Sequence, residues 1–238
     1  MANWYTDAYN VNASPAEDIP ELAGTHPSPI RFPLGLDTAG QNVEWNTADL
    51  PHLLVYGSTA DQTDVLLANI ARQAFNHERS WHLYSANAFG AGKHAHGLDE
   101  TAWHNPVNVN LYMVMMTELW KLYNFRLKTM EAYGAKDFSD LSRIRGTKRI
   151  MVLLPEVSLH NLNTTPEVKM MVEYMSLVAL RGHTVGMHGV FVVDSMDDSY
   201  VYSDILNHTF AEVALLRDAP EEDMVRFRKP VTRITPHH

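Results

Sequence analysis

Few side chains in this sequence have the type and spacing that common catalytic sites need. The chain has no cysteine, which excludes disulfides, thiolate metal sites and cysteine nucleophiles. His94 and His96 share a glycine-containing segment, but no third metal ligand lies near them in sequence. His160 has no serine or aspartate at a triad spacing, and the G-x-S-x-G and H-E-x-x-H motifs are absent. We therefore expect neither a metal site nor a hydrolase triad.

Composition and charge narrow the class of protein. Hydrophobic residues make up 45% of the chain and charged residues 20%, ordinary values for a globular protein with a full core. The net charge of −9 repels phosphates, which disfavours binding of nucleic acid. No apolar run approaches the roughly 18 residues of a membrane span, and the first residues do not resemble a signal peptide. We expect a cytoplasmic protein.

The first 29 residues differ in composition from the rest of the chain. Four prolines stand among small, polar and acidic residues, a pattern that predicts an extended arm with little core of its own. Trp4, Tyr5 and Tyr9 lie in the same segment, and aromatic side chains are common anchors in interfaces. Two interpretations stay open: a loosely ordered tail, and an arm that wraps a neighbouring subunit.

From residue 30 onward, the apolar pattern alternates between the periods of strands and helices. The expected strands are Ile30–Leu34, Asn42–Trp45, His52–Tyr56, Trp81–Ala86, Arg149–Leu154, Met187–Asp194 and Phe210–Leu216. The expected helices are Asp64–Phe75, Leu111–Tyr133 and Glu167–Leu180. The first two strands flank a turn at Gly40 and form a hairpin. The alternation predicts one α/β domain over residues 30–238, with a mainly parallel sheet covered on both faces.

Two segments carry narrower predictions. The long helix has an apolar stripe at spacings of three and four, made of Tyr112, Met116, Leu119, Tyr123, Leu127 and Met130. Beyond Leu216 the end of the chain is basic, with Arg226, Arg228, Lys229 and Arg233. That end is compatible with an edge strand or with a nucleic-acid contact.

Several blocks of the sequence, in order, resemble the motor domain of FtsK/SpoIIIE/HerA ATPases. The blocks are PLGLDTAGQNVEWNTADLPHLLVYGSTADQTD, ELWKLYNFRLKTMEAYGAKDFSDLSR, RIMVLLPE and ALRGHTVGMHGVFVVDS. They span about residues 30 to 217. The resemblance implies a RecA-like P-loop NTPase fold that begins with a β-hairpin. It also implies a subunit of a larger oligomeric machine.

The family's phosphate loop, G-x-x-x-x-G-K-[ST], falls on the eight residues Gly57, Ser58, Thr59, Ala60, Asp61, Gln62, Thr63 and Asp64. Of the four fixed positions only Gly57 is kept, because Gln62, Thr63 and Asp64 replace the second glycine, the lysine and the hydroxyl residue. A carboxylate about 4 Å from a phosphate oxygen costs on the order of 4 kcal/mol at an effective dielectric constant near 20. In addition, Asp61 or Thr63 can cap the following helix in place of a phosphate. The resemblance thus implies a vestigial nucleotide site.

The other elements of the family's catalytic site are also altered. The magnesium-binding aspartate and the catalytic glutamate of the Walker B strand fall on Pro155 and Glu156, so only a vestigial Glu156 remains. The end of the second strand reads Ser85-Ala86-Asn87 in place of D-P-K, and the polar A-T-Q sensor becomes Val192-Val193-Asp194. His183 replaces an arginine that contacts the neighbouring subunit's nucleotide in ring-forming relatives, and Arg181 is a second candidate for such a contact.

Two functions are compatible with these residues. The first is a degenerate ATPase domain, similar to those of type VII secretion motors, without a cofactor. It would act as a structural, regulatory or partner-docking subunit. The alternative is a weakly active translocase subunit that binds ATP and magnesium and moves DNA or protein. Both imply protein partners or self-assembly.

Overall fold

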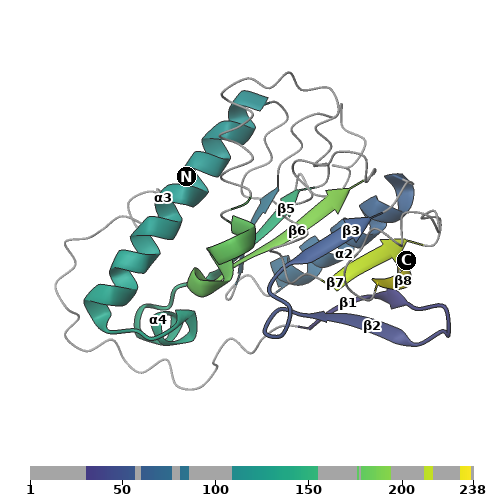
Figure 1. The fold of residues 1–238 in the computed structure, drawn as a ribbon, viewed down its shortest axis with the longest axis horizontal. Helices are drawn as coiled ribbons and strands as arrows, with labels where there is room; N and C mark the ends of the chain where they lie inside the picture. The colour runs from purple at the N-terminus through teal and green to yellow at the C-terminus, as the bar shows by residue number, and fades with distance from the viewer. Residues whose placement is uncertain are drawn as a thin grey trace.

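The fold was determined as a computed structural model, which describes residues 31–56, 60–76, 81–85, 109–154, 176, 178–193, 212–216 and 231–236 (Figure 1). The strands are β1 (Arg31–Leu36), β2 (Asn42–Asn46), β3 (Leu53–Tyr56), β4 (Trp81–Ser85), β5 (Arg149–Leu154), β6 (Met187–Val193), β7 (Glu212–Leu216) and β8 (Val231–Pro236). The helices are α2 (Ala60–Asn76), α3 (Val109–Tyr133), α4 (Phe138–Arg145) and the 3-10 helix η1 (Gly182–Val185). Among the described residues, no helix is long and apolar enough to cross a membrane.

The strands form a single eight-stranded sheet in the order β2-β1-β8-β7-β3-β6-β5-β4. All neighbouring strands from β8 to β4 pair in parallel, whereas β1 and β2 are antiparallel. The predicted mainly parallel α/β fold with an N-terminal hairpin is confirmed. All six parallel strands begin at one edge of the sheet, called here the amino edge, and finish at the opposite carboxyl edge.

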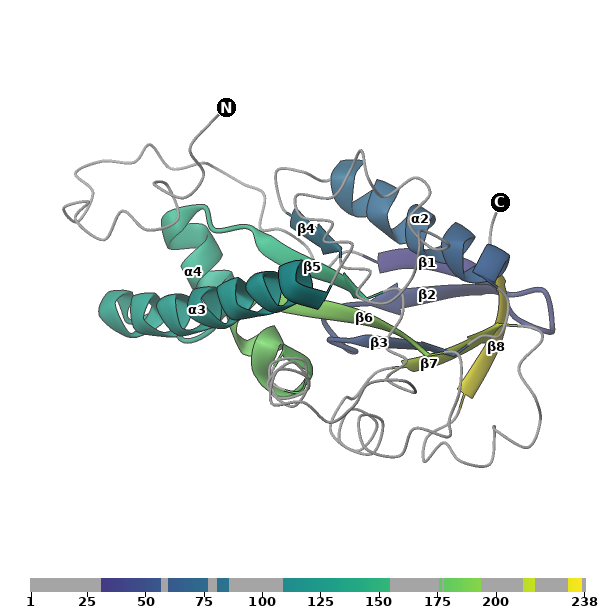
Figure 2. The ribbon, with the colours of Figure 1, turned by 90° about the horizontal axis from the view of Figure 1, so that it is seen from above.

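Helices cover both faces of the sheet, as the alternation of strand and helix patterns predicted (Figure 2). On one face, α2 buries Leu66, Leu67 and Ile70 in a core with apolar residues from seven strands. α3 lies on the other face of the sheet. In β4, Trp81 and Leu83 point toward α2, so the alternate residues His82 and Tyr84 point to the opposite face. Arg126 of α3 lies near these two residues. Strands buried on both faces explain the continuous apolar runs of β3 and β5.

The basic C-terminal segment forms an interior strand where the structure describes it, so the prediction of an edge strand is wrong. β8, which contains Arg233, pairs in parallel with β7 and through its last residues with β1. β8 therefore joins the hairpin to the parallel sheet. Gly35 permits this junction, because a Cβ atom at that position would overlap the carbonyl oxygen of Thr235.

The long helix differs from the predicted apolar stripe in two residues. Met116, Leu119 and Tyr123 are buried as expected, but Leu127 is 37% exposed. Arg126 is buried in its place, which apolar periodicity could not predict. The helix ends at Tyr133, and a positive φ at Gly134 follows, as expected.

Other element boundaries shift by small amounts. α4 was not expected as a separate helix; Asp137 caps its start and Gly146, in the left-handed conformation, ends it. α2 begins at Ala60 rather than at residue 64. Of the helix expected at Glu167–Leu180, only residues 176 and 178–180 lie within the described part, and all four are helical.

Candidate functional site

The positions of the expected nucleotide site meet at the carboxyl edge of the sheet. β3 ends at Tyr56, directly before the expected phosphate loop, and pairs there with Val193 of β6 and Leu215 of β7. From β3 the chain crosses to β4 on one side, while β7 and β8 lie on the other. In open parallel sheets, ligands bind outside the carboxyl ends of the strands at such a reversal of strand order. The fold thus places these positions where open parallel sheets bind their ligands.

The stretch that aligns with the phosphate loop is helical from Ala60 onward. Gly57, Ser58 and Thr59 lie outside the described residues, so three residues separate β3 from α2. Asp61 and Thr63 stand inside the first turn of α2, whereas a capping residue precedes the helix. The expectation that either residue caps α2 is therefore wrong.

The three replaced positions lie in the first two turns of α2. Thr63, at the position of the lysine, is only 1% exposed, so a short hydroxyl side chain occupies an enclosed position. Asp64 is half-buried. Gln62 Oε1 is buried and accepts no hydrogen bond in the described part of the chain. A buried oxygen of this kind requires a donor, and a phosphate group offers none.

The positions expected to bind magnesium and to sense the nucleotide are only partly within the described residues. β5 ends at Leu154, so Pro155 and Glu156 follow it directly and lie outside the description, as do Ala86, Asn87 and Asp194. Val192, at a sensor position, is buried in the core beneath α2. An apolar side chain that packs in the core cannot contact a phosphate.

Arg181 and His183 lie at the opposite edge of the sheet. Arg181 is the residue that precedes η1, and Gly186 then leads into the amino end of β6. Both side chains are exposed. The seven residues of β6 separate them from the carboxyl edge by roughly 20 Å. Neither can reach the nucleotide site of its own chain, which leaves only the predicted contact with a neighbouring subunit.

Two histidines that sequence reasoning did not single out connect β3 and β6 at the amino edge. The Gly189 N–H donates to His52 Nδ1 at 2.9 Å, which places the proton of the neutral imidazole on Nε2. His188 Nδ1 lies 2.9 Å from the Pro51 carbonyl oxygen, to which it donates. Both imidazoles are buried. The sequence signal was a histidine beside each of two buried strands, HLLVY and MHGVFVV.

Burial governs the charge state of this edge. It lowers the pKa of His52 well below its usual value, and the nearby His188 and His183 lower it further. Burial also lowers the pKa of His188 to about 3, although its bond to Pro51 opposes the shift. The imidazoles are therefore neutral at pH 7. The described residues contain no cluster of side chains that could hold a metal ion.

Arg126 is the second buried polar group that sequence reasoning missed. Its guanidinium donates at 2.6 Å to the carbonyl oxygens of Val185 and Lys148, so it ties α3 to the end of η1 and to the start of β5. The guanidinium also stacks on the Phe138 ring of α4, 5.1 Å from the centroid. Burial lowers its pKa to about 10, which leaves it charged at neutral pH.

Comparisons with known proteins show which solved structures share this architecture. No protein-family model matches the chain, and no curated protein matches its sequence. Solved structures do match. The pCW3 conjugation coupling protein TcpA, in its monomer form with ATPgS, aligns with a TM-score of 0.62 and 18% identity over 85% of this chain. The cytoplasmic domain of EssC aligns with a TM-score of 0.64 and 14% identity over 84% of it. ATPases 2 and 3 of Thermomonospora curvata EccC, in complex with a signal sequence peptide, align with a TM-score of 0.59 and 13% identity over 94%.

This chain is shorter than these matches. It spans 58% of the TcpA chain and 40% of each of the EssC and EccC chains. At such low identity the likeness establishes the fold, which is the one that the sequence blocks predicted. The chain therefore has the fold of the FtsK/SpoIIIE-type P-loop ATPase domains.

Proposed function

We propose that this chain is a catalytically degenerate FtsK-type ATPase domain that acts as a structural, regulatory or partner-docking part of a larger oligomeric machine. One observation carries the proposal: α2 begins where a phosphate loop should, but presents no lysine. Instead it holds an enclosed Thr63, a half-buried Asp64 and the unsatisfied Gln62 oxygen.

The physical argument concerns the charge that a bound phosphate would meet. The first four N–H groups of a helix lack partners within it, and they attract anions. At the start of α2 this attraction is opposed by Asp61 and Asp64. Thr63 stands at the position of the motif's lysine, so the motif itself supplies no cation for a phosphate. Loss of binding follows, at a tenfold loss of affinity for about every 1.4 kcal/mol.

Partners and location are part of the same proposal. EssC was solved as a cytoplasmic domain, and the EccC structure contains two ATPase domains together with a signal sequence peptide. By analogy, we place this chain in the cytoplasm, in contact with further subunits or with a polypeptide. The net charge of −9 makes the surface as a whole unfavourable for DNA binding.

A thermal-shift titration with Mg-ATP tests the proposal. A ligand at one hundred times its Kd stabilises a protein by roughly 2.7 kcal/mol. We expect no shift for this chain at millimolar Mg-ATP. The combined variant Gln62→Gly, Thr63→Lys, Asp64→Thr restores the three motif positions, and it should gain a clear shift. Equal titration with Mg-GTP shows whether any shift depends on the base.

If the chain is instead a weakly active translocase subunit, the opposite outcome is expected. A clear shift of the unmodified chain that Asp64→Ala or Glu156→Gln abolishes would favour that alternative, because these carboxylates would then hold magnesium or orient water. ATP hydrolysis above background, lost in Glu156→Gln, would establish it. A Thr164→Ala variant, outside every motif position, serves as the control.

A further inference from the structure

Positive charge gathers at one end of this acidic molecule. The end consists of the last turns of α3, α4, the residues before β5, and η1, which all meet around Arg126 (Figure 1). Its solvent-accessible cations are Lys128, Lys136, Arg145, Lys148 and Arg181. None of these five forms an ion pair with another residue of the described part. We call this surface the basic end.

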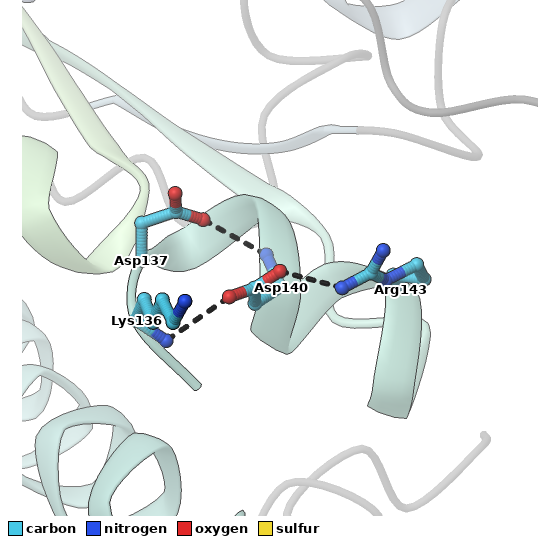
Figure 3. Close-up of polar contacts among 4 residues, drawn as sticks. All are labelled: Lys136, Asp137, Asp140 and Arg143. Atoms are coloured by element: carbon cyan, nitrogen blue, oxygen red, sulfur yellow. Dashed lines mark hydrogen bonds and ion pairs between the residues drawn. The ribbon is translucent and has the colours of Figure 1, made fainter. Parts of the chain in front are cut away.

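Two carboxylates of the basic end, Asp137 and Asp140, make contacts around the start of α4, as Figure 3 shows. Asp137 accepts the Asp140 N–H at 2.9 Å and so caps the helix. Asp140 accepts from the Arg143 guanidinium at 2.6 Å and from the Lys136 backbone N–H at 3.1 Å. The cations of the basic end therefore outnumber its carboxylates, which also include the exposed Glu131 of α3.

The basic end also exposes apolar side chains. Leu127, Tyr133, Ile144 and Leu180 are four of the six large hydrophobic side chains that are exposed among the described residues. Arg145 stacks on the Tyr133 ring, 5.2 Å from the centroid, and donates to the Tyr133 hydroxyl. A surface that mixes unpaired cations with apolar groups fits an acidic peptide with aromatic side chains better than it fits the uniform phosphates of nucleic acid.

The chain itself contains such a peptide. Residues 1–29 hold four carboxylates, Asp7, Glu17, Asp18 and Glu21, and no lysine or arginine. They also hold Trp4, Tyr5 and Tyr9. The segment therefore complements the basic end both in charge and in apolar character.

The topology favours a contact between two copies. β1 runs antiparallel to β8 and hence to all the parallel strands, so Arg31, where the segment joins the fold, lies toward the carboxyl edge. The basic end lies at the amino edge. Within the sheet, five strand spacings, roughly 24 Å in total, also separate β1 from β5. Arg31 thus lies on the side away from the basic end of its own copy, whereas a neighbour placed head to tail would present its basic end on the side of Arg31.

We infer that the N-terminal segment 1–29 of one copy binds the basic end of the next copy. The contact is heterologous, so repetition generates a ring or a filament. This inference rests on the proposed function only in taking the chain to assemble, and it is independent of whether ATP binds.

Zero-length carbodiimide coupling of the full chain tests the contact, since it joins a carboxylate to a lysine amine that touches it. An equal mixture of unlabelled and 15N-labelled protein is coupled and its linked peptides are weighed. We expect links from Glu17 and Asp18 to Lys128, Lys136 and Lys148, with mixed-isotope pairs among them. Raising the salt concentration from 0.1 to 1 M shortens the screening length from about 10 to about 3 Å and should reduce these links severalfold.

Matched variants complete the test. Glu17→Gln with Asp18→Asn should lower both the remaining links and the self-association several-fold. Glu44→Gln with Asp49→Asn, one carboxylate in β2 and one in the turn after it, should change neither. An unchanged urea-unfolding midpoint confirms that each variant is folded.

Three results would overturn the inference: links distributed evenly over Lys93, Lys169 and Lys229, links only within one isotope, or protection of the basic-end lysines by duplex DNA instead of by the segment. Self-association that persists in Glu17→Gln with Asp18→Asn would reject this contact while leaving the proposed oligomeric function intact. The Mg-ATP titration is read separately.

Discussion

The two edges of the parallel sheet differ in how their polar groups are used. At the amino edge, His52, His188 and Arg126 each bond a backbone group of a distant segment. At the carboxyl edge, Gln62 Oε1 has no hydrogen-bond donor among the described residues and Val192 has joined the core. The amino edge also contains buried nitrogens without a described partner, His52 Nε2 and Arg126 Nε, so the two edges differ in the long-range contacts that they make and not in complete satisfaction of their polar groups. Specific polar contacts join distant segments at one edge, while the other carries the positions that align with a phosphate loop.

An active ATPase needs both a stable fold and a site that binds a nucleotide. In this fold the two requirements depend on residues at different edges of the sheet. The strand order and the crossing of α2 depend on the core and on the amino-edge bonds, so they persist when the phosphate loop changes. Binding a nucleotide depends on a few charges at the carboxyl edge, so it can be lost without loss of the fold. Four predictions follow from the contrast, from the largest expected effect to the smallest.

Arg126→Met should destabilise the fold most. It removes two charge-assisted bonds and leaves the Val185 and Lys148 carbonyl oxygens without these donors, a loss of about 3 kcal/mol in the free energy of unfolding. Urea unfolding measures the change. Arg143→Met, which removes an exposed ion pair with Asp140, should cost less than about 0.5 kcal/mol. If both variants lost the same free energy of unfolding, the buried contacts of Arg126 would contribute no more than an exposed ion pair, and the contrast between the two edges would fail.

Acid should have the second largest effect, because it weakens the contacts of the amino edge. The pKa of His188 is lowered to about 3 in the folded state, against about 6.5 when unfolded, so below pH 6.5 the unfolded chain binds more protons. The contribution of His188 is complete above pH 6.5 and falls by about 1.4 kcal/mol per pH unit, hence by about 2 kcal/mol at pH 5. Unfolding free energies at pH 7.5, 6.0 and 5.0 measure the slope. His188→Gln should reduce the slope but not abolish it, because burial also lowers the pKa of His52 and lowers that of His82 to about 4. An unchanged slope would show that His188 is not among the groups responsible.

His52→Leu should cost about 1–2 kcal/mol, because the buried Gly189 N–H loses its acceptor. His52→Asn offers a side-chain oxygen near the position of Nδ1 and should recover part of the loss. Thermal unfolding compares the two variants. If leucine were as stable as asparagine, the hydrogen bond would contribute nothing and only the shape of the side chain would matter.

Gln62→Leu, at the carboxyl edge, should leave stability unchanged or raise it by up to about 1 kcal/mol. The change removes a buried oxygen that has no donor within the described part of the fold. Gln62→Glu is the matched comparison: it adds a third carboxylate beside Asp61 and Asp64 and should destabilise the start of α2. A marked loss of stability in Gln62→Leu would mean that this side chain supports the fold, as those of the amino edge do.

The sequence predicted the sheet and its two covered faces because apolar periodicity and strand–helix alternation are local patterns. Each described strand from β1 to β7 lies within two residues of its predicted bounds. The interior place of β8 escaped prediction, because it depends on a partner at the other end of the described fold. Arg126 escaped because a charged residue beside an apolar stripe is usually solvated, and only the folded chain brings the Val185 and Lys148 carbonyl oxygens to it.

The candidate site was predictable in position but not in geometry. The block resemblance placed Gln62, Thr63 and Asp64 after β3, and they follow it there, in the first two turns of α2. The early start of α2, and with it the wrong expectation of a cap at Asp61 or Thr63, depends on backbone geometry that a single sequence does not encode locally. The histidine contacts at the amino edge join residues 137 positions apart and leave no local pattern.

The interior place of β8 has a consequence for the order of folding during synthesis. β1 and β2 leave the ribosome first, but the strand that joins them to the parallel sheet is made near the end of the printed sequence. At roughly 5–20 residues per second, the hairpin waits on the order of ten seconds or longer for its partner. During that interval the edge of β1 stays open to pairing with other chains. A nascent chain of this protein therefore depends on β8 to close the open edge of β1.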